Sequence, residues 1–157
     1  MLLINAKIYT MDAEIIENGF IFIKDKKINK VGSMQALDLQ DENTIDLRGK
    51  SVYPGFIDAH THIGLFENGL GFEGEDGNEY TDPSTPHMKA IDAVNPMDKS
   101  FEEALLAGIT TVVISPGSAN PIGGQIFAMK TSGICVDDMV IKKPVAIKFA
   151  FGENPKM

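Results

Sequence analysis

The sequence has little cysteine and a deficit of basic residues. Cys135 is the single cysteine among 157 residues, which excludes an internal disulfide framework. With no second cysteine or adjacent histidine, we interpret it as a small core residue. The chain has 14 Lys and Arg residues and 22 Asp and Glu residues, which gives a net charge of −8. An acidic chain without a basic cluster is a poor partner for nucleic acid or an anionic membrane surface.

Long apolar runs are also missing. No segment approaches the roughly 20 apolar residues of a membrane-spanning helix. The N-terminus lacks the charged and apolar regions of a secretion signal. Hydrophobic residues make up 43% and charged residues 23% of the chain, which is typical of a globular protein. We therefore predict a cytoplasmic protein with no membrane partner.

Short β-type runs separated by turns fill residues 1–51. Residues 19–24 are apolar on both faces, which indicates a central strand, and the polar turn at 25–27 leads into a return strand. The expected hairpin therefore lies in the middle of this module. The predicted strands are residues 2–4 paired with 7–9, 19–24 paired with 28–31, and 45–49, with a helical turn at 34–37.

Two histidines, His60 and His62, follow the short apolar run 56–57. Side chains alternate across a strand, so residues i and i+2 share a face. The two imidazoles therefore point the same way, close enough to hold one divalent metal ion. Asp58 lies on the same face, where it could orient a histidine or stay buried and paired. The alternative is a pair of histidines on a solvated strand end.

Residues 64–98 are rich in glycine and carboxylates and show no long hydrophobic period. A loop of this length inside a compact domain is functional or mobile, so we predict a lid or pocket wall beside the histidines. His87 lies in a segment, 85–93, that could open with a short helix. We leave open whether His87 is a surface side chain or a substrate contact.

A helix and a strand are predicted next. Ser100 and Glu103 have the spacing of a capping box, Gly108 is placed to end the helix, and residues 109–114 form a β-branched run. Together with the histidine strand they complete a parallel βαβ unit. The Gly-rich segment 115–124 does not have the spacing of a phosphate-binding loop, so we interpret it as a substrate-pocket loop.

The remaining segments are predicted to be strands. Residues 125–130 are strand-like, Pro144 should stop one element, and 145–151 should form a third parallel strand. Lys148 falls on the small-residue face of that strand, and we interpret it as a snorkelling or ion-paired lysine. Glu153 follows at the strand's end, as a metal ligand or as a surface carboxylate.

Residues 54–62, Pro-Gly-Phe-Ile-Asp-Ala-His-Thr-His, resemble the first-strand signature of the amidohydrolase superfamily, and 108–112 resemble its second barrel strand. The resemblance implies an α/β fold with a small all-β module. Residues 1–51 would be the N-terminal part of a small β-sandwich. Residues 52–157 would be the first portion, about three βα units, of an incomplete (β/α)8 TIM-like barrel of about 250 residues.

The resemblance also implies a function. Members of the amidohydrolase superfamily are metal-dependent hydrolases, and the residue pattern of this chain is similar to that of imidazolonepropionase-like enzymes. This similarity implies that a metal-activated water attacks a non-peptide C–N bond of a small-molecule substrate. His60 and His62, with Glu153, would be the metal ligands. Zinc is the expected metal, with iron, manganese and nickel left open. Heterocycle deamination and small-dipeptide hydrolysis are the alternatives.

Family members carry further histidines and a general-base aspartate on later strands, for which this sequence has no positions. We therefore expect no catalytic residue here and interpret the chain as the N-terminal part of a longer enzyme, inactive alone. A complementary C-terminal polypeptide or a homo-oligomer is the expected partner. The alternative is a catalytically silent structural or interaction piece.

Overall fold

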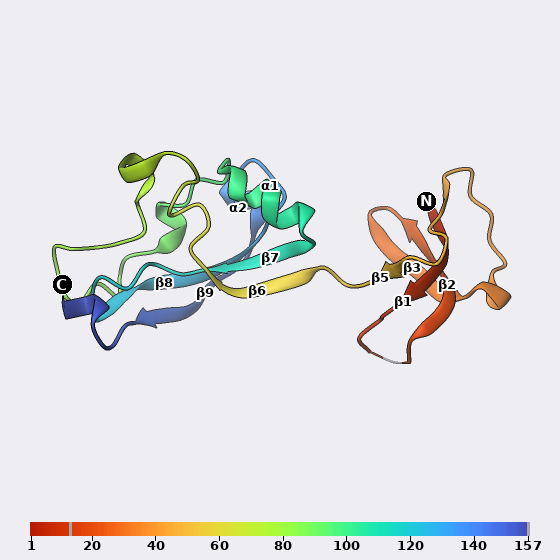
Figure 1. Ribbon diagram of the computed structural model, residues 1–157, viewed down its shortest axis with the longest axis horizontal. Helices are drawn as coiled ribbons and strands as arrows, with labels where there is room; N and C mark the ends of the chain where they lie inside the picture. The colour runs from red at the N-terminus through yellow and green to blue at the C-terminus, as the bar shows by residue number, and fades with distance from the viewer. Residues whose placement is uncertain (13, 157) are drawn as a thin grey trace. The chain divides into compact units, whose positions relative to one another are not determined.

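The computed structural model describes residues 1–12 and 14–156, which fall into two compact units, Met1–Pro54 and Gly55–Met157 (Figure 1). Each unit is built around its own β-sheet. Among the described residues, no helix is long and apolar enough to cross a membrane.

The first unit contains one five-stranded sheet in the order β3-β2-β1-β4, with β5 also paired to β1. β1, β2 and β3 run antiparallel, whereas β4 and β5 are parallel to β1. Within residues 1–12 and 14–54 the strands form this single sheet, so the second layer of the expected sandwich is not among them. The elements are β1 (Leu2–Ile8), β2 (Ile16–Lys24), β3 (Lys27–Ser33), the 3₁₀ turn η1 (Met34–Ala36), β4 (Thr44–Asp46) and β5 (Ser51–Val52).

The β2–β3 hairpin and the helical turn are confirmed, but one predicted strand pair is wrong. Asp25 and Lys26 join β2 to β3 with φ of 52° and 61°, the left-handed pair that suits a two-residue hairpin. Residues 2–4 and 7–9 do not pair with each other, because β1 runs through both. Asn5 (φ 55°) makes a bulge in β1 and donates a 3.0 Å hydrogen bond to Asp46 Oδ1.

The second unit has a four-stranded sheet in the order β6-β7-β8-β9. β6 and β7 are parallel and are joined through helix α1, so the predicted βαβ unit is confirmed. The elements are β6 (Phe56–Thr61), the 3₁₀ turns η2 (Gly71–Gly74) and η3 (Ala90–Asp92), α1 (Lys99–Leu106), β7 (Ile109–Ile114), β8 (Ile122–Lys130), α2 (Val136–Met139), β9 (Val140–Phe149) and η4 (Asn154–Lys156).

The expected third parallel strand is confirmed only in part: β9 runs in the same direction as β6 and β7, but it does not pair with β7, because β8 lies between them. β8 is antiparallel to β7, and β9 is antiparallel to β8, so the sheet continues as hairpins after its one βαβ unit. Pro144 does not stop an element but lies inside β9. Proline is tolerated there because β9 is an edge strand and the ladder with β8 is irregular beside it.

The N-cap of helix α1 lies two residues before the predicted one. Asp98, not Ser100, is the N-cap, and its carboxylate accepts a hydrogen bond from the Ser100 amide. Gly108 ends the helix with φ of 87°, as expected for a C-terminal glycine. Phe101 is the buried residue of this short helix.

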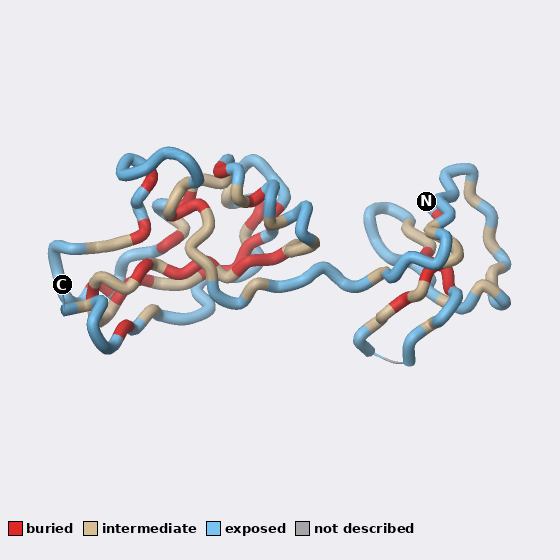
Figure 2. The backbone as a smooth tube through the Cα atoms, viewed as in Figure 1, coloured by how far each residue is buried: buried red, intermediate tan, exposed pale blue. Residues whose placement is uncertain are grey.

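The core of the second unit lies between the sheet and α1. Buried residues follow β7 and β8, whereas β6 and β9 are mostly exposed (Figure 2). This leaves the two edge strands of the sheet with apolar side chains in solvent. The core residues are Leu65, Ala90, Val94, Phe101, Val112, Ile114, Phe127, Met129 and Met139.

Candidate metal centre

The two histidines lie side by side at the carboxyl end of β6. His60 is the last residue but one of β6, and His62 is the first residue beyond the end of the strand at Thr61. Their ring centroids are 5.3 Å apart and the ring planes meet at 78°. The i and i+2 spacing thus brings both imidazoles to one place, as the sequence predicts.

The His62 ring is held by the neighbouring strand. Its Nδ1 lies 2.6 Å from the carbonyl oxygen of Ser115, the residue after β7. A carbonyl oxygen can only accept, so Nδ1 carries the proton and Nε2 keeps a free lone pair. Metal-binding histidines commonly donate their other ring N–H in this way. The Ser115 amide donates to Thr61 O (3.0 Å), which ties the ends of β6 and β7 together.

Other neighbours complete the surroundings of the pair. The Phe66 ring contacts the His62 ring edge-to-face, with centroids 5.7 Å apart. Asp58 is half-buried, and its Oδ1 accepts a 3.1 Å hydrogen bond from the His60 backbone amide rather than from either ring. His60 is exposed and His62 is half-buried. The His62 ring is therefore held in place, whereas His60 is exposed to solvent.

Glu153 is not brought to the histidines. It lies exposed beside η4, where its carboxylate forms a 3.0 Å ion pair with Lys156 Nζ. Across residues 1–12 and 14–156, no group of three or more His, Cys, Asp or Glu side chains is placed to hold a metal ion. The chain thus presents a two-histidine half-site.

Three further residues singled out in the sequence lie away from the pair. Lys148 is half-buried with its stem over Gly123, and it forms no ion pair with any described residue, which leaves packing of its stem as its visible role. His87 is exposed. Cys135 is also exposed, so its interpretation as a core residue is wrong.

The long acidic segment is ordered by specific contacts. Asn120 is buried, and its side-chain amide donates to Thr85 Oγ1 (2.7 Å) and to Asp82 O (3.2 Å). Asp98 accepts hydrogen bonds from the Gly64 and Asn68 amides. No local pattern indicates these contacts, because each one joins positions 30 or more residues apart.

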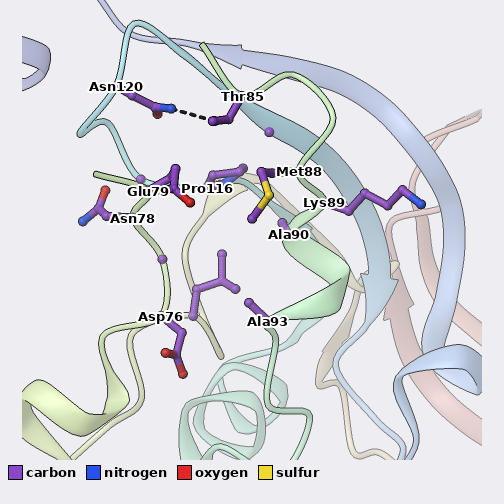
Figure 3. Close-up of a pocket in the computed structure, with 14 residues that line it drawn as sticks. Asp76, Asn78, Glu79, Thr85, Met88, Lys89, Ala90, Ala93, Pro116 and Asn120 are labelled. Atoms are coloured by element: carbon purple, nitrogen blue, oxygen red, sulfur yellow. Dashed lines mark hydrogen bonds between the residues drawn. The ribbon is translucent and has the colours of Figure 1, made fainter. Parts of the chain in front are cut away.

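A cavity of about 80 Å³ lies between residues 76–79, 85–93 and 116–124 (Figure 3). Asn78, Glu79 and Thr85 give it a polar side, and Lys89 extends away from it. Neither histidine lines it. The Gly-rich loop therefore does form a pocket wall, but of a cavity separate from the histidine pair.

The chain is similar to known amidohydrolases in sequence and in structure. No family model matches the chain. The crystal structure of an amidohydrolase from Thermotoga maritima MSB8 is 46% identical, with a TM-score of 0.88 over 99% of this chain. Amidohydrolase tasK of Hapsidospora irregularis is 34% identical over 118 residues. The chain belongs to the amidohydrolase superfamily.

The chain spans only part of its amidohydrolase relatives. It covers 40% of the Thermotoga chain and 11% of tasK. A 5-methylthioadenosine/S-adenosylhomocysteine deaminase of Bacillus thuringiensis is 43% identical over 63 residues, which is 14% of that protein. Amidohydrolases generally use a divalent metal, and the half-site suits one, because a fixed His62 ring and a neighbouring imidazole offer two nitrogen ligands.

Proposed function

We propose that this chain supplies the first two metal ligands, His60 and His62, of an amidohydrolase that cleaves a non-peptide C–N bond in an amide, a cyclic amide or an amidine. The observation that carries the proposal is the 2.6 Å hydrogen bond from His62 Nδ1 to the Ser115 carbonyl, which leaves Nε2 free and oriented. A solvated pair of histidines would not need a partner for one ring from a residue 53 positions away in the sequence.

The chain's own residues bind and orient in this proposal. His62 is fixed through Ser115, and exposed His60 would be the second ligand of the same ion. Zinc is the proposed metal, with iron, manganese or nickel as alternatives. When bound, it would activate a water for attack on the C–N carbon. A catalytic zinc takes three protein ligands, so at least one more ligand and the general base would come from outside residues 1–12 and 14–156.

Deamination of a heterocycle is the second candidate. It is favoured by the Bacillus deaminase, which is 43% identical to 63 residues of this chain. Both candidates use the same histidine pair and differ in the bond broken. Release of ammonia from an exocyclic amino group supports deamination, whereas opening of a ring or release of a carboxylate supports amide hydrolysis.

We also propose that the site is completed by a second polypeptide. β6 and β9 are the two edges of the sheet, and edge strands carry unpaired backbone groups that can pair with another chain. Phe56 and Ile57 on β6 are 56% and 66% exposed, and Ile147 and Phe149 on β9 are 45% and 51% exposed. Apolar edges of this kind fit a partner that adds further strands.

Metal binding tests the ligand pair. We expect stoichiometric zinc in the purified protein by elemental analysis, or micromolar binding by titration. His60→Ala and His62→Ala should each weaken binding by about 100-fold or more, beyond what loss of a supporting hydrogen-bond partner causes. His87→Ala, which removes the exposed histidine away from the pair, is the matched control and should bind as the wild type does.

Two results would overturn this assignment. One is zinc binding that is unchanged in both His60→Ala and His62→Ala. The other is an equal loss in His87→Ala. Glu153→Gln separates the two-histidine site from the three-ligand site expected in the sequence, because only the three-ligand site would lose affinity when the Glu153 carboxylate becomes an amide.

The partner proposal is tested by mixing. We expect the chain to form a complex, in sedimentation velocity, with the part of the Thermotoga amidohydrolase that it does not match. Ile57→Lys should block the complex by placing a charge on the β6 edge. Ile28→Lys is the control, since Ile28 is 67% exposed but lies in the other unit. Self-association of the chain alone, or equal disruption by both variants, would contradict the proposal.

A further inference from the structure

The loop that follows β7 connects His62 to the acidic segment. Its first residue, Ser115, is 1% exposed and accepts the His62 Nδ1 hydrogen bond. Two residues later, the Gly117 amide donates a 2.7 Å hydrogen bond to Gly77 O, and the Ala119 amide donates to Asn78 Oδ1 at 3.3 Å. The carbonyl that holds His62 is therefore itself held, through this loop, by residues 77 and 78.

The contact between Gly117 and Asn78 has no spare room. A Cβ atom on Gly117 would lie 2.0 Å from Asn78 Oδ1 and 2.7 Å from its Cγ. Gly117 and Gly77 are both buried, and Asn78 is half-buried at the wall of the cavity (Figure 3). Only a glycine lets the loop backbone approach the Asn78 amide this closely.

We propose that Gly117 and Asn78 are positioning residues for His62. They set the distance of the 115–119 loop from the 77–78 segment, and through it the place of the Ser115 carbonyl. A shift of the loop that relieves a Cβ contact of 2.0 Å with Asn78 Oδ1 would lengthen the 2.6 Å hydrogen bond to Nδ1. The ring then loses its fixed tautomer and orientation. In this respect the acidic segment supports the half-site.

The proposal rests on the proposed function only where metal affinity is concerned. The tautomer of His62 is a property of the metal-free protein and is measured separately. Residues that orient a metal-binding histidine typically change affinity by about 10- to 100-fold when replaced. We expect that range for Gly117→Ala and a smaller loss for Asn78→Ala, which removes the acceptor of the Ala119 amide without adding volume.

The experiment compares wild type, Gly117→Ala, Asn78→Ala and the double variant. Long-range ¹H–¹⁵N spectra at about pH 8, where ordinary imidazole is neutral, should show the Nδ1–H tautomer of His62 in the wild type and a mixture in Gly117→Ala. Zinc titration of the same samples should show the matching loss of affinity. The double variant lacks all three amide atoms that the new Cβ would meet, so it should recover toward Asn78→Ala alone.

The outcomes separate this proposal from the proposed function. A wild type that binds no zinc, with a tautomer that still changes in Gly117→Ala, overturns the metal site and supports the positioning role. An unchanged His62 tautomer and affinity in both single variants overturns the positioning role. If Gly117→Ala does not fold, Asn78→Ala decides alone: an unchanged tautomer and zinc affinity in that folded variant overturns the proposal.

Discussion

The Asp98→Ala variant is expected to lose about 3 kcal/mol of the free energy of unfolding of the second unit. Asp98 is 6% exposed. Its two oxygens accept hydrogen bonds from the Gly64, Asn68 and Ser100 amides at 3.2 Å each and from Ser100 Oγ at 2.6 Å. Truncation leaves these donors without an acceptor and uncaps α1. Because the chain has no Trp, circular dichroism during urea unfolding is the suitable measurement.

The pH dependence of this effect has a definite sign. Burial alone would raise the pKa of Asp98, but the hydrogen bonds from Ser100, Asn68 and Gly64 outweigh burial and lower the pKa below its ordinary value of 3.8. A group with a lowered pKa in the folded state stabilises the protein above its unfolded pKa, and this stability is lost as pH falls through the folded pKa. The contribution should therefore be complete at neutral pH and disappear in acid.

Asp98→Asn is the control for charge. Asparagine is about as good an N-cap as aspartate, but it has no carboxyl proton to bind. We expect this variant to be less stable than the wild type at neutral pH, and the difference to shrink steadily below about pH 4. A difference that stays constant across this range would contradict the role of the ionised carboxylate.

Local patterns in the sequence predict the elements around the half-site well. The β-branched run of β7, the glycine at 108 and the i, i+2 histidines depend on neighbouring residues only, so the βαβ unit and the pairing of His60 with His62 follow from them. The two-residue turn between β2 and β3 likewise depends on neighbouring residues only.

Features that depend on distant residues are not visible in such patterns. Alternation of large and small side chains in 145–151 gives a strand but not its neighbours, so the pattern does not show that the antiparallel strand β8 lies between β7 and β9. The capping pattern Ser-x-x-Glu predicts Ser100 as the N-cap of α1. Asp98 is the N-cap instead, because its carboxylate also accepts hydrogen bonds from the Gly64 and Asn68 amides, 30 and more residues away. Ser115 lies 53 residues from His62.

Gly64→Ala is expected to destabilise the second unit by about 3 kcal/mol, against about 1 kcal/mol for Gly69→Ala. Both glycines have left-handed backbone, with φ of 76° and 85°, so both variants carry the strain of a Cβ in that region. The two positions differ in the room that is available for a Cβ atom. A Cβ on Gly64 would lie 2.6 Å from Val94 and 2.8 Å from Phe101, whereas one on Gly69 meets nothing within 4 Å.

Gly64 and Gly69 lie in the same unit and have the same left-handed backbone conformation. The difference in stability between the two variants therefore measures the effect of core packing at Gly64, two residues beyond His62. Gly64 is buried, and its carbonyl accepts a 2.9 Å hydrogen bond from Asn95, so the loop cannot move outward without breaking that bond and the one to Asp98. We therefore expect Gly64→Ala, but not Gly69→Ala, to broaden the His62 ring signals as well as to lower the urea midpoint. Equal losses in both variants would mean that backbone strain alone decides, and that the core does not constrain the segment after the histidines.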